Sequence, residues 1–106
     1  MDSTGRQLRQ QGRPIVIVQS EPGVTFNSVI LCLFTTFDSS AIPTRVKIDP
    51  ADDNGLKKAS YVMTEKLLTV DKNELGVRIG ELTSEQMHEI SRQLAKVLAI
   101  DKDDVD

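Results

Sequence analysis

The chain has 106 residues, which suits a single domain large enough to bury a core without disulfides or metals. Its hydrophobic content of 39% is typical of a globular protein, and its one cysteine, Cys32, excludes a disulfide framework or a cysteine-based metal site within the chain. No apolar run approaches the ~20 residues of a membrane-spanning helix, and the N-terminus lacks the apolar stretch of a signal peptide. The sequence therefore predicts a cytoplasmic protein with no membrane partner.

The net charge of −3 argues mildly against a nucleic-acid partner, but the charges are unevenly distributed. Residues 1–48 carry five Lys or Arg against three acids, whereas residues 67–106 carry five against nine. The first half therefore forms the more cationic surface, and net charge alone does not decide the partner.

The first predicted strands are continuous apolar runs. Residues 1–12 are polar and rich in Gln and Arg, so we expect a mobile segment there without a strand. Residues 15–18 form a β-branched run without alternation, which predicts a strand covered on both faces. Residues 29–34, VILCLF, predict a second such strand, with Cys32 as a small core residue.

Residues 44–48 instead alternate between apolar and polar side chains. This pattern predicts a half-exposed strand with Val46 and Ile48 facing inward and with Arg45 and Lys47 facing solvent. A loop follows, in which we expect Gly55 to adopt a positive φ.

The remaining chain predicts more short strands and then a helix. The strands are expected at residues 59–64, 67–70 and 77–79. Thr83 and Gln86 have the spacing of a capping box, which marks the start of a helix. Apolar residues follow at helical spacing: Met87, Ile90, Leu94 and Leu98.

His88 falls on the polar face of this helix, and we expect it to be exposed. The order of several strands and one helix favours a small antiparallel barrel or sandwich closed by a C-terminal helix. We interpret residues 101–106 as a solvated acidic tail.

Polar side chains flank three of the predicted strands. Arg13 precedes the first strand, Thr35 and Thr36 follow the second, and Glu65 and Lys66 follow the fourth. If these strands share a sheet, the three groups meet on one rim, where a cation, hydroxyls and a carboxylate can bind and cleave a phosphodiester without a metal. The plain alternative is that strand ends are polar because they reach water. The sequence shows no phosphate-binding glycine loop, nucleophile elbow or zinc spacing.

The segments RPIVIVQS, VILCLFTT, IPTRVKIDP, NGLKKASYVMTEKLLTVDK and RIGELTSEQMHEI, in this order, resemble the MazF/PemK family of toxin endoribonucleases over about residues 12–100. The resemblance implies a mainly β fold with a C-terminal helix, a small SH3-like barrel that works as a homodimer. It also implies cleavage of single-stranded RNA without a metal or cofactor. The 2′-hydroxyl attacks its own phosphate and leaves a 2′,3′-cyclic phosphate and a 5′-hydroxyl. A cognate antitoxin, whose tail covers the RNA groove, is implied as a partner.

The resemblance also assigns site residues. Arg13 stands at the position of the family's arginine, which acts as an acid or stabilises the transition state. Thr35 stands at the position of the threonine that ends the second strand of the family pattern. Glu65 stands at the acidic position after the fourth strand, which is a candidate general base in some members. The residues expected to contact RNA are Gln19, Ser20, Thr36 and Lys66.

One departure from the family pattern concerns the N-terminus. Family members normally have a strand ahead of the Arg-Pro pair, and residues 1–11 show no such pattern. We therefore expect a polar segment at residues 1–12, the toxin domain at residues 13–100 and the acidic tail at 101–106. The alternatives are a non-catalytic or gyrase-inhibiting toxin on the same fold, a degenerate module that only binds antitoxin, and a generic SH3-like binding module.

Overall fold

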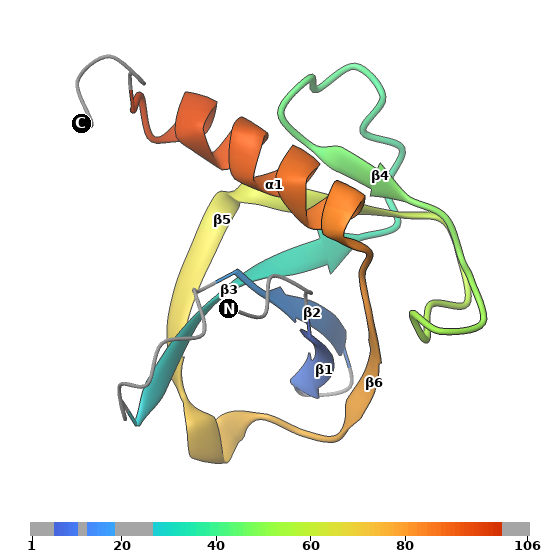
Figure 1. Ribbon diagram of the computed structural model, residues 1–106, viewed down its shortest axis with the longest axis vertical. Helices are drawn as coiled ribbons and strands as arrows, with labels where there is room; N and C mark the ends of the chain where they lie inside the picture. Colours follow the sequence, from blue (N-terminus) through green and yellow to red (C-terminus); the bar gives the residue numbers. More distant parts are fainter. Residues whose placement is uncertain (1–5, 11–12, 19–26, 101–106) are drawn as a thin grey trace.

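A computed structural model describes residues 6–10, 13–18 and 27–100. The elements in chain order are β1 (Arg6–Gln10), β2 (Arg13–Ile17), β3 (Ser28–Thr35), β4 (Val46–Ile48), β5 (Ser60–Asp71), the 3-10 helix η1 (Lys72–Glu74), β6 (Arg78–Glu81) and α1 (Ser84–Val97). The strands form one sheet in the order β4-β5-β3-β2-β1-β6, and every neighbouring pair is antiparallel (Figure 1). Within the described residues, no helix is long and apolar enough to cross a membrane.

The sheet curls so that its two ends approach each other. The backbone N–H of Glu81, at the end of β6, donates to the carbonyl of Asp53 in the loop after β4, at 2.9 Å. A Cβ on Gly80 would lie only 2.5 Å from that same carbonyl oxygen. Gly55 has the predicted positive φ, 72°, and a Cβ there would lie 2.2 Å from the carbonyl oxygen of Ile79. Both glycines thus permit the close contact that joins the sheet ends.

The middle of each central strand is covered on both faces, as the unbroken apolar runs predict, but Ile30 of β3 is 40% exposed. Ile15 and Val16 are neighbours on β2 that point to opposite faces, and both are fully buried. Val16 packs with Cys32 on the face covered by α1, while Ile15 packs with Leu31 on the other face. Burial raises the pKa of the Cys32 thiol to about 12, so this side chain is a protonated core residue.

The C-terminal helix begins as predicted. The backbone N–H of Gln86 donates to the Thr83 hydroxyl at 3.1 Å, and the Gln86 side chain accepts from the backbone N–H of Thr83 at 2.9 Å. These two bonds complete the capping box and satisfy donors that the first helical turn leaves free. His88 is exposed, in agreement with its place on the polar face.

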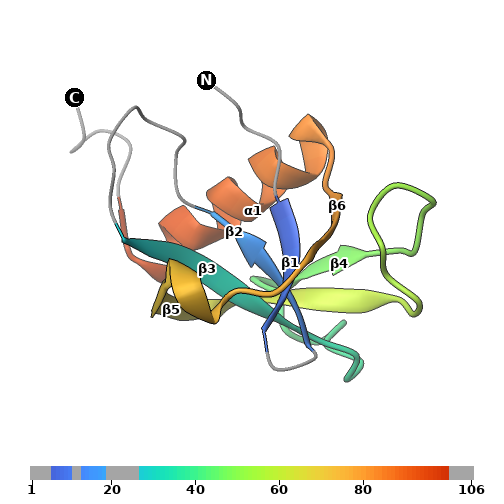
Figure 2. The ribbon, with the colours of Figure 1, turned by 90° about the horizontal axis from the view of Figure 1, so that it is seen from below.

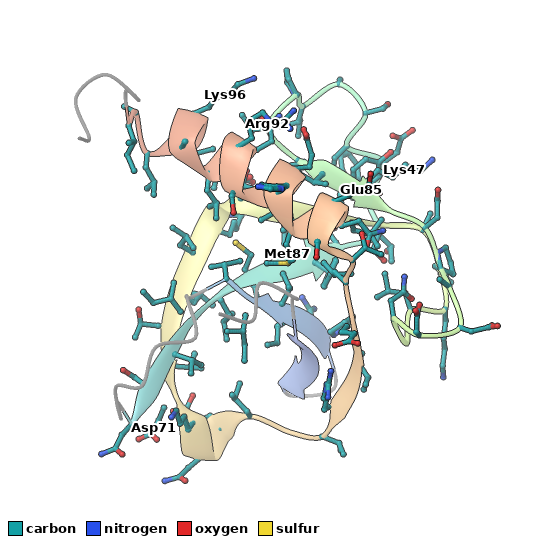
Figure 3. All side chains as sticks on the ribbon, in the orientation of Figure 1. Lys47, Asp71, Glu85, Met87, Arg92 and Lys96 are labelled. Carbon is teal, nitrogen blue, oxygen red and sulfur yellow. The ribbon has the colours of Figure 1, made fainter. Side chains whose placement is uncertain are left out.

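The apolar face of α1 lies across one side of the curled sheet (Figure 2). Met87 and Ile90 are buried and Leu94 packs against the same cluster, so these side chains belong to the core of the monomer. Figure 3 shows Met87 directed toward the strands and Lys96 directed away from them. Leu98 is 51% exposed and lies outside this core, because the helix ends at the preceding residue.

The prediction that no strand precedes Gly12 is wrong. β1 pairs with β2, with Gln7 opposite Val16, and it also pairs with β6, with Gln7 opposite Gly80. Its sequence, RQLRQ, has neither apolar alternation nor high strand propensity. The strand forms because backbone partners lie on both sides of it, and the sheet therefore includes residues ahead of residue 13.

The prediction of separate fourth and fifth strands is also wrong, because β5 is one continuous strand with a bulge. Cys32 of β3 pairs with Leu67, but the next residue, Leu33, pairs with Met63. Residues 64–66 are therefore extra on β5 and have no partner position on β3. Bulges bend a strand, and Figure 1 shows β5 sharply bent along its length.

The burial of Ile90 generates a stability prediction. Ile90 is fully buried between α1 and the sheet, so Ile90→Ala should lower the free energy of unfolding by about 2–5 kcal/mol. The matched control is Ile100→Ala, because Ile100 is 49% exposed and its truncation should cost within about 0.5 kcal/mol. Urea unfolding followed by circular dichroism measures both, and equal losses in the two variants would contradict the packing described here.

Candidate functional site

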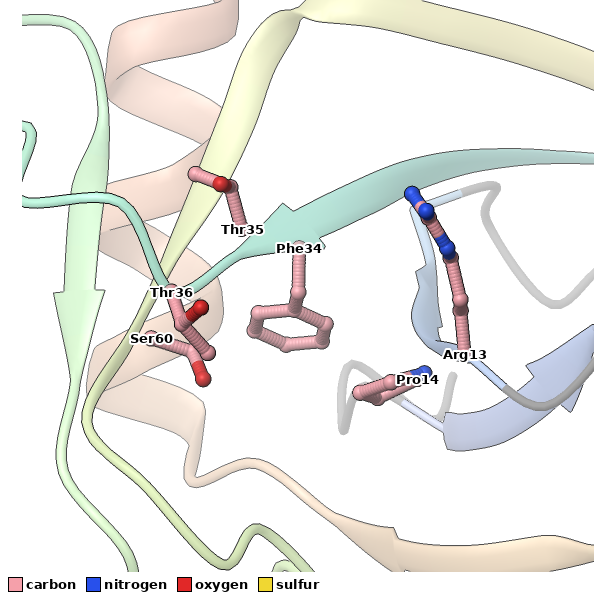
Figure 4. Close-up of a pocket in the computed structure, with 6 residues that line it drawn as sticks. All are labelled: Arg13, Pro14, Phe34, Thr35, Thr36 and Ser60. Atoms are coloured by element: carbon pink, nitrogen blue, oxygen red, sulfur yellow. The ribbon is translucent and has the colours of Figure 1, made fainter.

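An open pocket of about 300 Å³ lies where β2 begins and β3 ends. Its lining residues are Arg13, Pro14, Phe34, Thr35, Thr36 and Ser60 (Figure 4). β2 and β3 are antiparallel, with Ile15 opposite Leu33, so the start of β2 and the end of β3 lie at the same end of the strand pair, and Arg13 and Thr35 both line the pocket there. Strand pairing therefore brings together the first two polar groups that the sequence predicted to meet.

The pocket combines an exposed cation, hydroxyls and a buried aromatic ring. Figure 4 shows the Phe34 ring between Arg13 and Pro14 on one side and Thr36 and Ser60 on the other. Phe34 is only 6% exposed, while Arg13 is exposed. Proline at the next position holds the Arg13 backbone in an extended conformation. A guanidinium and hydroxyls in this arrangement suit a phosphate group.

The Thr35 hydroxyl already takes part in one hydrogen bond, as an acceptor. Its oxygen accepts a hydrogen bond from the backbone N–H of Phe37 at 3.1 Å. A hydroxyl carries one donor hydrogen besides its acceptor lone pairs, so this bond leaves the Thr35 hydrogen available for an anion. The loop after β3 thus orients Thr35 as a donor at the pocket.

Glu65 and Lys66 do not line this pocket, so the expected meeting of three polar groups is only partly realised. Both residues are exposed on the bulge in the middle of β5, and not at a strand end. Glu65 instead pairs with Arg45: the Arg45 Nε donates to Glu65 Oε2 at 3.0 Å, and Arg45 Nη2 bonds the same oxygen. The prediction assumed that a strand ends at residue 64, but β5 continues, so Glu65 and Lys66 lie within the strand and not at its end.

Arg45 was expected to face solvent, and this expectation is wrong. Its side chain is only 13% exposed, because it bonds to Glu65 on β5 and donates from Nη1 to the Ser39 hydroxyl at 3.0 Å. The hydrogen bond from Arg45 is the main reason that the pKa of Glu65 lies below its ordinary value. Glu65 is therefore a carboxylate at neutral pH and a weaker base than an unpaired glutamate.

Two predicted RNA contacts, Gln19 and Ser20, lie outside the described residues. Among the residues that the structure describes, no group of three or more His, Cys, Asp or Glu side chains is placed to hold a metal ion.

Sequence reasoning did not single out Ser60, Arg45 or Phe37 as site residues. Ser60 is buried at the pocket wall, and its place there depends on the pairing of β5 with β3. The Arg45–Glu65 contact joins residues 20 apart along the chain, so no local pattern reveals it. Phe37 did leave a signal, since it is an aromatic residue between the polar residues Thr36 and Asp38 in a loop.

The fold and pocket define a small curled β-sheet protein with a pocket that is lined by an arginine and two threonines. Residues 2–98 match the family described as "PemK-like, MazF-like toxin of type II toxin-antitoxin system". The chain therefore belongs to the MazF/PemK toxin family, which confirms the resemblance seen in the sequence. The match begins ahead of residue 6 and so includes β1.

Individual relatives and solved structures agree with this assignment. The chain is 34% identical over 88 residues to the probable endoribonuclease MazF of Mycolicibacterium smegmatis, covering 83% of this chain and 81% of the relative. It is 28% identical over 90 residues to endoribonuclease EndoA of Bacillus subtilis, covering 83% and 77%.

Among solved structures, an endoribonuclease from a mycobacterial species superposes with a TM-score of 0.76 at 29% identity, covering 90% of this chain and 88% of that chain. A mycobacterial endoribonuclease in complex with its cognate antitoxin gives a TM-score of 0.76 at 26% identity, covering 95% and 96%. These superpositions confirm the predicted fold class, the small SH3-like barrel of this toxin family with its C-terminal helix.

The Arg45–Glu65 pair predicts a pH dependence of stability. Because the pKa of Glu65 is lowered in the folded state, its carboxylate stabilises the protein above the ordinary glutamate pKa of about 4.3, and this contribution is lost as the pH falls through the lower folded value. The parent should exceed Glu65→Gln in stability at pH 7, and the difference should shrink toward pH 3. Urea unfolding at both pH values measures it.

The matched control for this prediction is the same substitution in an Arg45→Met background, where the partner is gone. There, the pH-dependent part of the Glu65→Gln effect should be much smaller. An equal pH dependence in both backgrounds would show that Arg45 does not lower the pKa of Glu65.

Proposed function

We propose that this chain is a toxin endoribonuclease that cleaves single-stranded RNA and is neutralised by a cognate antitoxin. The observation that carries the proposal is the pocket that Arg13 and Thr35 line together, in a chain whose relatives are named endoribonucleases. The solved relative bound to its cognate antitoxin supports the second part. We place the protein in the cytoplasm, as a homodimer, on the basis of the family resemblance.

In the proposed reaction, the 2′-hydroxyl of one nucleotide loses its proton to a base, and its oxygen attacks the adjoining 3′-phosphate. The bond from phosphorus to the 5′-oxygen of the next nucleotide breaks, and that oxygen takes up a proton from water. The products are a 2′,3′-cyclic phosphate and a 5′-hydroxyl, and the step needs no metal. Negative charge builds up on the phosphate oxygens during attack. The Arg13 guanidinium presents several N–H donors in a planar fork, so it serves by stabilising this charge.

Thr35 supplies a second donor to the same phosphate. The Thr35 oxygen already accepts a hydrogen bond from the backbone N–H of Phe37, and the hydroxyl hydrogen is available to donate to a phosphate oxygen. We assign Thr36, in the same pocket, and Lys66, exposed on the β5 bulge, to contacts with the RNA backbone. Gln19 and Ser20 keep this assignment from the sequence alone.

Glu65 keeps, from the sequence resemblance alone, the assignment as acceptor of the 2′-hydroxyl proton, although it does not line the pocket of Arg13 and Thr35. Arg45 keeps it ionised and fixes its Oε2 atom, but the same hydrogen bond lowers its pKa and with it the proton affinity of the carboxylate. A base works best when its pKa lies near the working pH. We therefore expect Glu65 to contribute less to the rate than Arg13.

The alternatives of a non-catalytic toxin or a degenerate antitoxin-binding module drew their weight from an absent first strand. β1 occupies that place in the sheet and pairs on both sides. Endonuclease activity is therefore the function that this structure supports best.

The function is tested with a long single-stranded RNA in the presence of EDTA. The parent should cleave it and leave 2′,3′-cyclic phosphate and 5′-hydroxyl ends, which end-labelling identifies. Arg13→Ala should lower the single-turnover rate by about 10²- to 10³-fold, because a donor to the transition-state charge is lost. Glu65→Gln should lower it by less than about 10²-fold, the lower end for general base catalysis.

The control variant is Arg92→Ala, which removes an exposed cation on α1 away from the pocket and should cleave like the parent. Circular dichroism checks that each variant is folded. Cleavage by Arg13→Ala at the parental rate would refute the site. A folded parent that cuts no RNA would support the non-catalytic alternative.

A further inference from the structure

Phe37 is an exposed aromatic side chain next to the pocket. It is 68% exposed, whereas the other described aromatic residues, Phe34 and Tyr61, are 6% and 8% exposed. An aromatic ring left in water forgoes a large stabilisation from burial. It follows Thr35 by two residues, and its backbone N–H holds the Thr35 hydroxyl at 3.1 Å.

The backbone at Phe37 is held from both sides. Besides the bond from its N–H to Thr35, its carbonyl accepts from the Ser39 hydroxyl at 2.9 Å. Ser39 is buried and in turn accepts from Arg45 at 3.0 Å. Both polar groups of the Phe37 peptide are therefore fixed by side chains, and the ring itself is not what anchors the loop.

A second set of bonds ties the same loop to the sheet. The Tyr61 hydroxyl on β5 donates to Asp38 Oδ1 at 3.2 Å, and the backbone N–H of Ser40 donates to the same oxygen at 3.0 Å. Tyr61 is the direct pairing partner of Thr35. The bond from Ser40 is the main cause that lowers the pKa of Asp38, so its carboxylate stays charged and keeps both donors. These bonds hold the loop backbone in place while the Phe37 ring remains exposed to solvent.

We propose that Phe37 is a base-stacking residue that contacts the nucleotide next to the phosphate held by Arg13 and Thr35. This inference rests on the proposed RNA-cleaving function and extends it to a substrate contact. A phosphate site and an exposed aromatic ring two residues apart match the alternation of phosphate and base along a nucleic-acid strand. Stacking positions a strand without selecting one base, because every base has a π-face.

The fixed loop favours this role for a physical reason. Because the backbone at Phe37 is already held, a base that stacks on the ring does not have to order the loop. The entropy cost of binding is therefore smaller, and more of the stacking energy contributes to affinity. The ring would then hold one base of a bound strand while its neighbouring phosphate enters the pocket. Phe37 is thus a substrate-positioning and affinity residue, while Arg13 and Thr35 act on the phosphate.

The test uses a single-stranded RNA that carries 2′-O-methyl groups throughout, so that it binds without being cleaved. Fluorescence anisotropy should show that Phe37→Ala and Phe37→Leu bind it roughly 5- to 100-fold more weakly than the parent, while Phe37→Trp binds at least as well. The control, Val77→Ala, removes another exposed apolar side chain, 75% exposed, and should bind like the parent.

Two further measurements distinguish the loss of stacking from other causes of weaker RNA binding. The slope of affinity against salt should stay the same in Phe37→Ala, because no phosphate contact is removed, and should fall in Arg13→Ala. An abasic nucleotide placed at each position in turn should weaken parental binding at one position near the pocket. At that position Phe37→Ala should show no further loss.

Four results would overturn the inference. If the parent cleaves RNA and Phe37→Ala binds and cleaves equally well, the ring has no role in RNA binding, although the proposed function stands. If Phe37→Leu retains affinity, the contact is apolar and not stacking. If Phe37→Ala loses affinity only for the protein encoded by the adjacent gene, the candidate antitoxin, then the ring is a protein contact. A parent that neither binds nor cleaves RNA refutes the proposed function itself, and the inference falls with it.

Discussion

The pairing of β2 with β3 is the constraint on which the other features depend. Ile15 and Val16 point to opposite faces and both are fully buried, so a slip of one residue would move each side chain to the wrong face. The same two strands carry Arg13, where β2 begins, and Thr35, where β3 ends, and both residues line the pocket. The contacts that stabilise the sheet therefore also fix the geometry of the pocket, and Pro14 restricts the backbone at the point where the cation emerges.

A chain of hydrogen bonds connects this pocket to the bulge on β5. It runs from the Thr35 hydroxyl through the peptide of Phe37 to the Ser39 hydroxyl, then through Arg45 to Glu65. The pocket and the bulge are thus parts of one connected polar network, although Glu65 does not line the pocket. The network also accounts for a loop that is well held while its aromatic ring stays in solvent.

Much of this arrangement was predictable where the signal is local. The capping box at Thr83, the two-sided burial of the first apolar strands and the Arg-Pro pair each depend on neighbouring residues, and the structure agrees with them. β1 was missed because RQLRQ owes its strand to backbone partners on both sides and not to its own side chains. The place of Glu65 was missed because β5 continues through a bulge at residues 64–66 and does not end there. The contact of Glu65 with Arg45 was missed because the two residues are 20 positions apart in the sequence.

The most direct test of the account is whether Arg13 and Thr35 act on one phosphate as a unit. A double-mutant cycle with Arg13→Ala and Thr35→Val, measured by single-turnover cleavage of single-stranded RNA, decides this. The valine keeps the branched shape and removes only the hydroxyl. If the two residues share a phosphate, the double variant should be little slower than Arg13→Ala alone, because the effects of groups that work together are not additive. Rate losses that simply multiply would show that the two side chains act independently and would contradict the site.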